Sequence, residues 1–190
     1  MKKLYILGKI LKSDSKAIAV VGARKMTKRG EKLTKKFVTE LVKAGYTIVS
    51  GLAKGVDTVA HQTALSLGGR TIAVLGSGLD IIYPMENKGL AAEIAKRGAV
   101  VTIFPKGTKP LAKNFLVRNR TIVALAKGVL VVEGKRRSGT LSTASWAANG
   151  GKEVFAIPGS EATDWLIEQG ANVARDPIDI IEYFNASYHC

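Results

Sequence analysis

The strongest constraint on the fold is a repeated alternation of short apolar runs with longer helical patterns. The runs are rich in Val, Ile and Ala, and they cover residues 17–21, 47–49, 71–75, 100–103, 129–132 and 152–157, with one more short run at 4–7. Because these runs are apolar at consecutive positions, they predict strands buried on both faces, as in a parallel sheet covered by helices. Right-handed crossovers then give an α/β fold with a doubly wound, mainly parallel sheet and helices on both faces.

The helical patterns lie between the predicted strands. They cover residues 28–43, 56–67, 86–96, 118–126, 140–148 and 163–169, while residues 177–184 close the chain. In the first pattern Leu33 and Phe37 share an apolar face opposite the lysines, Thr27 is the expected N-cap, and Gly45 stands at the expected C-terminal stop. A length of 190 residues fits a single α/β domain, and no linker or internal repeat divides residues 1–190.

The formal charge of +14 is distributed unevenly along the chain. Residues 1–45 hold 13 basic and 3 acidic side chains, residues 106–137 hold 9 basic and 1 acidic, and residues 161–190 hold 1 basic and 6 acidic. This asymmetry predicts a basic face with a neutral or acidic far side, which suits a polyanionic partner such as nucleic acid. For the N-terminal lysines, a merely solvated surface is the alternative interpretation.

Several classes of protein are excluded by simple counts. The one cysteine, Cys190, allows neither an intrachain disulfide nor a cysteine-based zinc site. No run of 18 apolar residues appears, which argues against a membrane span. The apolar N-terminal stretch is interrupted at Lys9 and Lys12, unlike a signal peptide, so an intracellular, cytoplasmic protein is expected. We expect no cofactor and no metal ion.

The segment from Asn114 to Arg120 carries the densest binding chemistry. It places one aromatic ring, two guanidinium groups and two amides within seven positions, and lysines precede it at 106, 109 and 113. A second cluster occupies residues 135–140, Lys-Arg-Arg-Ser-Gly-Thr. Arginine forks and lysines suit phosphate oxygens, and an exposed Phe can stack on a base. If Phe115 is instead buried, it is only a core residue.

The predicted topology brings such segments together. In an open parallel sheet, ligands bind beyond the carboxyl ends of the strands, near the switch in strand order. Gly, Ser or Thr, usually with a cation, follows nearly every strand, at residues 22–25, 50–55 (beginning with Ser50 and Gly51), 76–78, 104–108 and 133–140. Glycine lets backbone N–H groups approach an anion, and helix N-termini favour negative charge. The sequence therefore predicts a phosphate-binding edge.

Other chemistry is less well supported. There is no G-x-G-x-x-G fingerprint, no Walker A motif, no nucleophile with a base and an orienting group, and no metal-ligand cluster. His61, four positions after Asp57, could serve as a general base, but we interpret it as a residue that orients a loop. Asp57 is interpreted as a helix-dipole partner or cap. Glu133 is expected to pair with a nearby cation, and substrate binding at the strand end is the alternative. Trp146 and Trp165 are expected in the core or an interface.

Six motifs in a fixed order carry a family resemblance. They are residues 20–24 (VVGAR), 50–61 (SGLAKGVD through AH), 73–84 (AVLGSGLD through YP), 114–120 (NF through RNR), 138–140 (SGT) and 155–159 (FAIPG). Together they resemble the DNA-processing protein A (DprA/Smf) family, over about residues 4–170. The resemblance implies an extended Rossmann fold and single-stranded DNA binding. It also implies protection of incoming strands in natural transformation, help in loading a RecA-type recombinase, a homodimer, and no established enzymatic activity.

The resemblance also implies a DNA-binding set. Matched motif by motif, it comprises Arg24, Lys54, Asn114, Phe115, Arg118, Asn119, Arg120, Arg137, Ser138, Gly139 and Thr140. Lys113 and Lys135 join the set from charge and position alone. The chain departs from the family in Ala23, where Ser is usual, and in the short segment 160–165 after Pro-Gly. The additional N-terminal helical and C-terminal winged-helix-like domains of many members are not expected, and the apolar residues 178–184 are our candidate for part of a dimer interface.

Two other functions use the same anion pocket. Related enzymes that resemble the Lonely-guy phosphoribohydrolases have a Gly-Gly-x-Gly-Thr loop followed by a catalytic Glu. Here residues 137–144 read Arg-Ser-Gly-Thr-Leu-Ser-Thr-Ala and contain no carboxylate, so a ribosyl intermediate would lack its partner. The remaining alternative is a sensor that binds a mononucleotide without chemistry.

Overall fold

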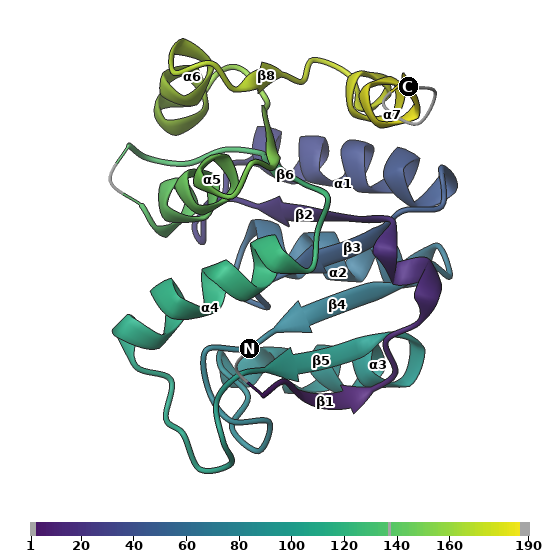
Figure 1. Ribbon diagram of the computed structural model, residues 1–190, viewed down its shortest axis with the longest axis vertical. Coiled ribbons are helices and arrows are strands. Elements are labelled where there is room, and N and C mark those ends of the chain that lie inside the picture. Colours follow the sequence, from purple (N-terminus) through teal and green to yellow (C-terminus); the bar gives the residue numbers. More distant parts are fainter. Residues whose placement is uncertain (1–2, 137, 187–190) are drawn as a thin grey trace.

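A computed structural model describes residues 3–136 and 138–186. Within these residues, eight strands form one sheet in the order β1-β5-β4-β3-β2-β6-β7-β8 (Figure 1). All neighbours are parallel except β1, which runs antiparallel to β5 at the edge. The strands are β1 (Tyr5–Gly8), β2 (Ala17–Val21), β3 (Thr47–Ser50), β4 (Thr71–Val74), β5 (Ala99–Thr102), β6 (Gly128–Val131), β7 (Glu153–Ala156) and β8 (Asn172–Val173). The predicted doubly wound α/β fold is confirmed.

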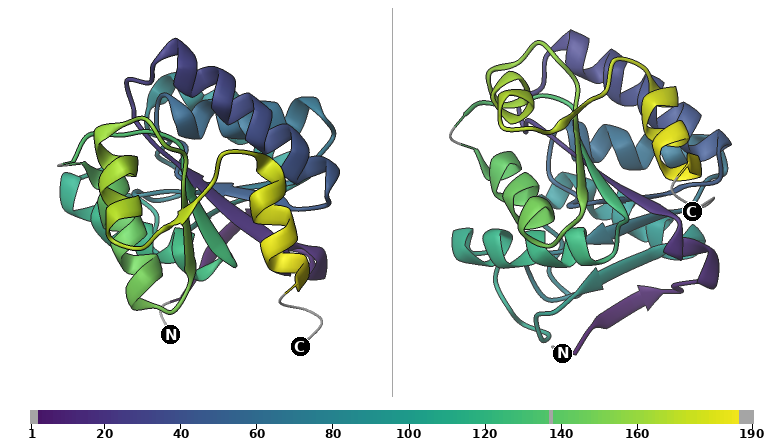
Figure 2. Two further views of the ribbon diagram at one scale, coloured as in Figure 1. Left: turned by 90° about the horizontal axis from the view of Figure 1, so that it is seen from above. Right: turned by 45° about the horizontal axis from the view of Figure 1, so that its top comes forward.

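Helices cover both faces of this sheet, as Figure 2 shows. One face carries α1 (Lys28–Lys43), α2 (Val56–Ser66), α3 (Lys88–Arg97) and α7 (Pro177–Ala186), and the other carries α4 (Ala112–Ala124), α5 (Gly139–Asn149) and α6 (Glu161–Glu168). Two short 3-10 helices, η1 (Lys12–Ser15) and η2 (Met85–Asn87), precede β2 and α3. None of the helices in the described residues is long and apolar enough to cross a membrane.

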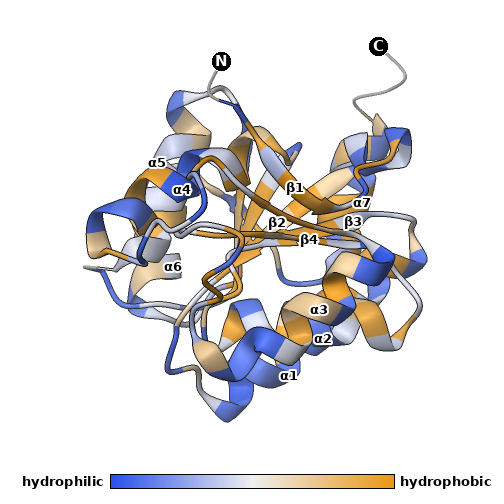
Figure 3. Cartoon of the chain, turned by 90° about the horizontal axis from the view of Figure 1, so that it is seen from below, coloured by the Kyte–Doolittle hydropathy of each residue, from blue (hydrophilic) through white to orange (hydrophobic). Residues whose placement is uncertain are grey.

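The core explains the continuous apolar strands. Every residue of β2, β3, β4, β5 and β6 is buried, and in Figure 3 these strands form an apolar layer between helices whose outer faces are hydrophilic. Helix α1 packs Phe37 and Leu41 into this core and begins at Thr27, whose hydroxyl accepts a 2.9 Å hydrogen bond from the Gly30 N–H. Gly45 follows the helix with a φ of 79°. The predicted boundaries of this helix are confirmed.

Helix α4 and strand β8 differ from the sequence prediction. Helix α4 begins at Ala112 and not at 118, so Asn114 and Phe115 lie on a helix rather than in a loop. The prediction was too short because the first turns of this helix bury the polar residues Asn114 and Arg118 and expose Leu116, so they lack the usual apolar stripe. The two-residue strand β8 was not predicted, since two residues are too few to show a pattern.

Candidate nucleic-acid groove

The candidate site lies at the switch in strand order. From β2 the chain builds the sheet outward through β3, β4 and β5, and then returns to add β6 on the other side of β2. A cavity of about 740 Å³ opens at the carboxyl ends of these strands, which point to the left in Figure 1. Its walls come from the segments after β2, β3, β4 and β6, from α4 and from the N-terminal part of α5. This is the position that the topology predicts for a ligand.

The aromatic part of the groove is formed by Phe115 and Tyr83. Their ring centroids lie 5.7 Å apart with the planes tilted by 46°. Phe115 is partly buried, because its ring lies against Gly76, where a Cβ atom would come within 2.7 Å of the ring. Tyr83 is 48% exposed, and the Arg24 guanidinium lies 5.5 Å from the Phe115 centroid. Both rings line the cavity, so a planar ligand has aromatic surface to contact.

Arg118 holds the floor of the groove together. Its side chain is 4% exposed, and its Nη1 donates hydrogen bonds to the backbone oxygens of Gly51 and, at 2.5 Å, of Val74. Its Nε donates to the Asn119 Oδ1 at 3.2 Å. Burial lowers the pKa of Arg118 to about 10, so it remains charged at neutral pH. Arg118 therefore joins α4 to the ends of β3 and β4.

Asp57 supplies the opposite charge in this floor. The carboxylate is buried at the start of α2 and accepts hydrogen bonds from the N–H groups of Gly51, at 3.1 Å, and Ala53, at 3.3 Å. Burial raises the pKa of Asp57, and the Arg118 charge opposes that rise. Asp57 lies in the first turn of α2, as predicted for a helix-dipole partner, but its carboxylate orders the loop after β3 and does not cap the helix. Gly51 is required beside it, because a Cβ atom there would collide with the Arg118 guanidinium.

Two predicted phosphate ligands, Ser50 and Gly51, use their polar groups in hydrogen bonds within the protein. Ser50 is fully buried and its hydroxyl donates to the Val20 carbonyl at 2.7 Å. The N–H of Gly51 donates to Asp57, and its carbonyl accepts from Arg118. Both residues lie at the carboxyl ends of the strands, where ligands are expected to bind, but their polar groups connect neighbouring strands and loops. We therefore leave Ser50 and Gly51 out of the proposed binding surface.

The start of α5 forms another wall of the groove. Ser138, Gly139 and Thr140 line the cavity, and Asn119 Nδ2 donates to the Gly139 carbonyl at 3.3 Å, which links α4 to α5. The Ser138 Oγ is buried and has no hydrogen-bond partner among the described residues. Arg137, the remaining predicted ligand of this turn, lies outside the described residues.

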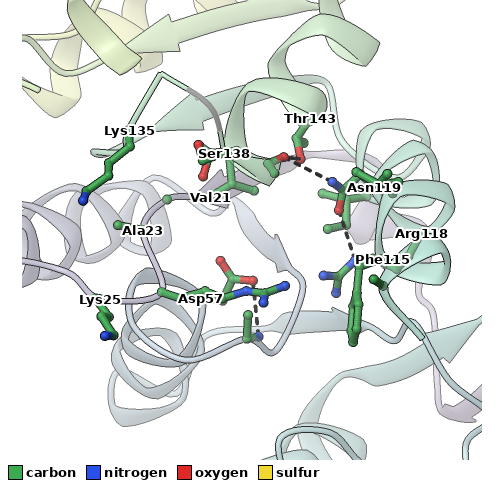
Figure 4. A pocket seen from close by; sticks show the side chains of 18 of the residues that line it. Val21, Ala23, Lys25, Asp57, Phe115, Arg118, Asn119, Lys135, Ser138 and Thr143 are labelled. Atoms are coloured by element: carbon green, nitrogen blue, oxygen red, sulfur yellow. Dashed lines mark hydrogen bonds between the residues drawn. The ribbon is translucent and has the colours of Figure 1, made fainter. Parts of the chain in front are cut away.

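Exposed cations surround the opening. Arg24, Lys25 and Lys135 line the cavity with exposed side chains, and Figure 4 shows Lys25 and Lys135 across from the wall that carries Phe115 and Arg118. Lys54 is exposed but bridges to Glu86 at 2.6 Å, which raises the pKa of Lys54. These charges give the groove a positive rim.

The remaining predicted ligands lie on α4, near the groove. Lys113 is exposed on the first turn, and the buried Asn114 donates to the Lys109 carbonyl at 3.0 Å. The exposed Arg120 places its guanidinium 3.6 Å from the centroid of the Trp146 ring. Asn114 therefore anchors the start of the helix, while Lys113 and Arg120 present charge outside the cavity.

Two other polar residues have structural roles that differ from the predictions. Glu133 accepts hydrogen bonds at 2.7 Å from both the N–H and the hydroxyl of Thr27, so the predicted pairing with a cation is wrong. His61 is fully buried, and its Nδ1 lies 2.6 Å from the Thr71 hydroxyl on β4, so it connects α2 to a strand and does not orient a loop. Across the described ranges, no three His, Cys, Asp or Glu side chains form a metal-binding group.

Sequence reasoning did not single out Tyr83 or Lys25 as ligands. Lys25 follows Arg24 directly after β2, so its position at the carboxyl end of a strand was a signal for a ligand-binding residue. Tyr83 lies nine residues beyond the end of β4, at the end of the motif of residues 73–84, and this motif was the signal that could have found it. The two tryptophans are partly buried against the core, as predicted.

Comparisons with known proteins identify close relatives. The family model for DNA recombination-mediator protein A matches residues 2–185. Protein Smf from Escherichia coli is 45% identical over 193 residues, which cover 98% of this chain and 52% of that protein. The DNA processing protein DprA of Streptococcus pneumoniae is 43% identical over 173 residues, covering 88% of this chain and 61% of that protein. The chain thus spans roughly half the length of these curated relatives.

Solved structures agree with the sequence relatives. DNA processing protein A from S. pneumoniae superposes with a TM-score of 0.89 at 41% identity, over 94% of this chain and 65% of that one. DNA processing protein A from Helicobacter pylori, whose structure concerns a single-stranded DNA binding mode, superposes with a TM-score of 0.90 at 33% identity. The match covers 98% of this chain and 88% of that one. A molybdenum cofactor binding protein from Rippkaea orientalis, with a TM-score of 0.67 at 20% identity over 90% and 96%, shares only the fold.

Proposed function

Because the chain belongs to the DNA recombination-mediator protein A family, as its motifs predicted, we propose that the groove at the β2/β6 switch binds single-stranded DNA. The observation that supports this most strongly is the combination of two accessible aromatic rings with a rim of exposed cations in one cavity. Stacking on aromatic rings is tolerant of sequence, because every base has a π-face, and cations follow the backbone.

Each part of the groove has a separate task in this proposal. A base enters the cavity and contacts Phe115 and Tyr83, while Arg24, Lys25 and Lys135 contact the phosphates. The N-terminus of α5 offers further backbone donors to a phosphate or a base carbonyl. In a duplex the bases are paired and stacked, so they cannot reach the rings. The groove therefore selects single strands.

The wider role follows from the family and is part of the proposal. A protein that covers single strands protects them and can pass them to a RecA-type recombinase during DNA uptake or recombination. We propose a non-enzymatic, cytoplasmic protein that acts as a homodimer through α7, where Ile178 and Tyr183 are exposed on an acidic segment away from the basic groove.

A salt titration tests the proposed function. Labelled dT oligomers are compared with duplexes of equal length at increasing salt. With about three to five phosphates neutralised by the rim cations, we expect a slope of log K against log salt of roughly −2 to −3.5. Equal affinity for duplex, or saturable binding of mononucleotides without dependence on oligomer length, would refute single-strand binding and favour a nucleotide sensor.

Replacing Phe115 by alanine tests the stacking contact. We expect the affinity for dT oligomers to fall by about 5- to 150-fold, equivalent to about 1–3 kcal/mol for one stacked base. The matched control is Leu111→Ala, which removes a 49% exposed apolar side chain at the start of the same helix but outside the cavity. If Phe115→Ala lowers only the free energy of unfolding and leaves the affinity of the folded protein unchanged, the ring is a packing residue.

A further inference from the structure

A second cavity lies beside the groove and shares one cation with it. This cavity of about 650 Å³ is lined by Lys135, Arg136, Leu141, Glu161 and Trp165. It lies between the segment that leads into α5 and the first turns of α6, on the face of the sheet that α4, α5 and α6 cover. Because Lys135 lines both cavities, a strand that leaves the groove at Lys135 meets this second cavity next.

The second cavity contains an indole ring with a cation over it. The Arg136 guanidinium lies 5.8 Å from the centroid of the Trp165 ring. Arg136 is exposed, whereas Trp165 is partly buried and packs against the core. A guanidinium and a nucleobase are both planar groups that stack on indole, so the position of Arg136 indicates a face that accepts a base.

The ring is held in a fixed position relative to the groove. Helix α6 begins at Ser160, which forms a capping box with Thr163. The N–H of Gly134, just after β6, donates to Ser160 Oγ at 3.1 Å, and the Gly134 carbonyl accepts from the Ala162 N–H at 3.0 Å. These contacts connect the start of α6 to the same segment that carries Lys135. The second site is therefore organised before a ligand arrives, which reduces the entropy lost on binding.

Glu161 gives this cavity an exposed carboxylate, whereas the carboxylate that lines the groove, Asp57, is buried. Its exposed carboxylate lines the cavity together with Lys135 and Arg136, which carry the opposite charge. A carboxylate repels phosphate but accepts hydrogen bonds from an exocyclic amino group such as cytosine N4. The phosphate of a bound nucleotide therefore belongs with Lys135 and Arg136, and its base belongs between Trp165 and Glu161. Cytosine fits this arrangement better than thymine, which has no amino group.

We propose that this cavity is a second nucleotide subsite, in which a base of the same DNA strand stacks on Trp165 with its phosphate at Lys135 and Arg136. The inference rests on the proposed function, because it extends the strand held in the first groove. It gives the strand a direction over the protein, from the Phe115 groove across the start of α5 towards α6. It also gives Trp165 a role beyond packing.

Tryptophan fluorescence tests the subsite directly, since the sequence contains only two tryptophans. In a Trp146→Phe variant, Trp165 is the sole reporter. We expect oligo-dC of about 12 nucleotides to quench it on binding, while oligomers of about three nucleotides bind the first groove with little quenching. Oligo-dT of the longer length should bind more weakly than oligo-dC, and Glu161→Gln should reduce that difference.

Affinity measurements complete the test. Trp165→Leu, which keeps an apolar side chain against the core, should weaken binding of the longer oligomers about tenfold and leave the shortest unchanged, whereas Phe115→Ala should weaken both. The second subsite would be overturned if DNA leaves the Trp165 fluorescence of Trp146→Phe unchanged and Trp165→Leu binds with unchanged affinity. If binding still depends on Phe115, the proposed function stands. Absence of all single-strand binding by the wild-type chain would overturn both.

Discussion

Replacing Arg118 by alanine is expected to lower the free energy of unfolding by about 3–5 kcal/mol, the usual cost of leaving a buried charge without its partner. The substitution leaves the backbone oxygens of Gly51 and Val74 without their donor. It also leaves the buried Asp57 carboxylate without the positive charge that opposes its desolvation. Urea denaturation followed by circular dichroism measures this difference. Loss of DNA binding in this variant would follow from collapse of the groove floor.

The matched control is Arg120→Ala, two positions further along α4. Arg120 is exposed, and its stacking on Trp146 accounts for at most about 1 kcal/mol. Arg120→Ala should therefore lower the free energy of unfolding by no more than that amount. If Arg118→Ala proves as stable as the control but loses affinity and flattens the salt dependence, Arg118 contacts phosphate directly and its structural role is refuted.

The fold could be predicted because its main signals are local. Five of the strands are buried along their entire length, so their apolar runs are continuous in the sequence. Parallel strands bring the loops at their carboxyl ends to one edge of the sheet, which is why Arg24 and Lys135 could be assigned to the same site from the sequence alone. The start of α4 could not be predicted, because its first turns bury polar Asn114 and Arg118 and expose Leu116, the reverse of the usual pattern.

The roles of polar residues could not be predicted for a different reason. Arg118 donates to carbonyls that lie 67 and 44 positions away in the chain. Glu133 similarly meets Thr27 across 106 positions. A residue type and its spacing indicate what a side chain can bind, but the partner it meets depends on the packed fold. The sequence therefore located the groove and did not separate the residues that build it from those that face a ligand.

Acid is expected to destabilise this protein through His61. The Thr71 hydroxyl donates to the Ile48 carbonyl at 2.8 Å, so it accepts from the His61 Nδ1–H at 2.6 Å. The His61 Nε2 is then the unprotonated nitrogen, and it is buried without a partner in the described part of the chain. Burial, together with the nearby Arg118 charge, lowers the pKa of His61 from 6.5 to about 3. The folded protein thus excludes a proton that the unfolded chain binds below pH 6.5.

The sign and size of this effect follow from proton linkage. Between pH 6.5 and 3 the unfolded state binds more protons, so the free energy of unfolding falls as the pH falls, by roughly 3 kcal/mol at pH 4 relative to neutral pH. The lowered pKa of Asp14 reduces the free energy of unfolding only as the pH falls below its unfolded value of 3.8. The raised pKa of Asp57 has the opposite effect on the free energy of unfolding as the pH falls. Both groups remain in His61→Gln, so the difference between the two pH profiles isolates the histidine.

Urea denaturation from pH 7.5 to 4 measures both profiles. At pH 7.5 His61→Gln should have a lower free energy of unfolding than the wild type, because the amide does not reproduce the imidazole packing. Its free energy of unfolding should fall less steeply with decreasing pH, because its unfolding takes up about one proton fewer. The two curves should therefore converge towards pH 4. Parallel curves would mean that His61 titrates in the folded state as it does in the unfolded chain, and that water reaches its Nε2.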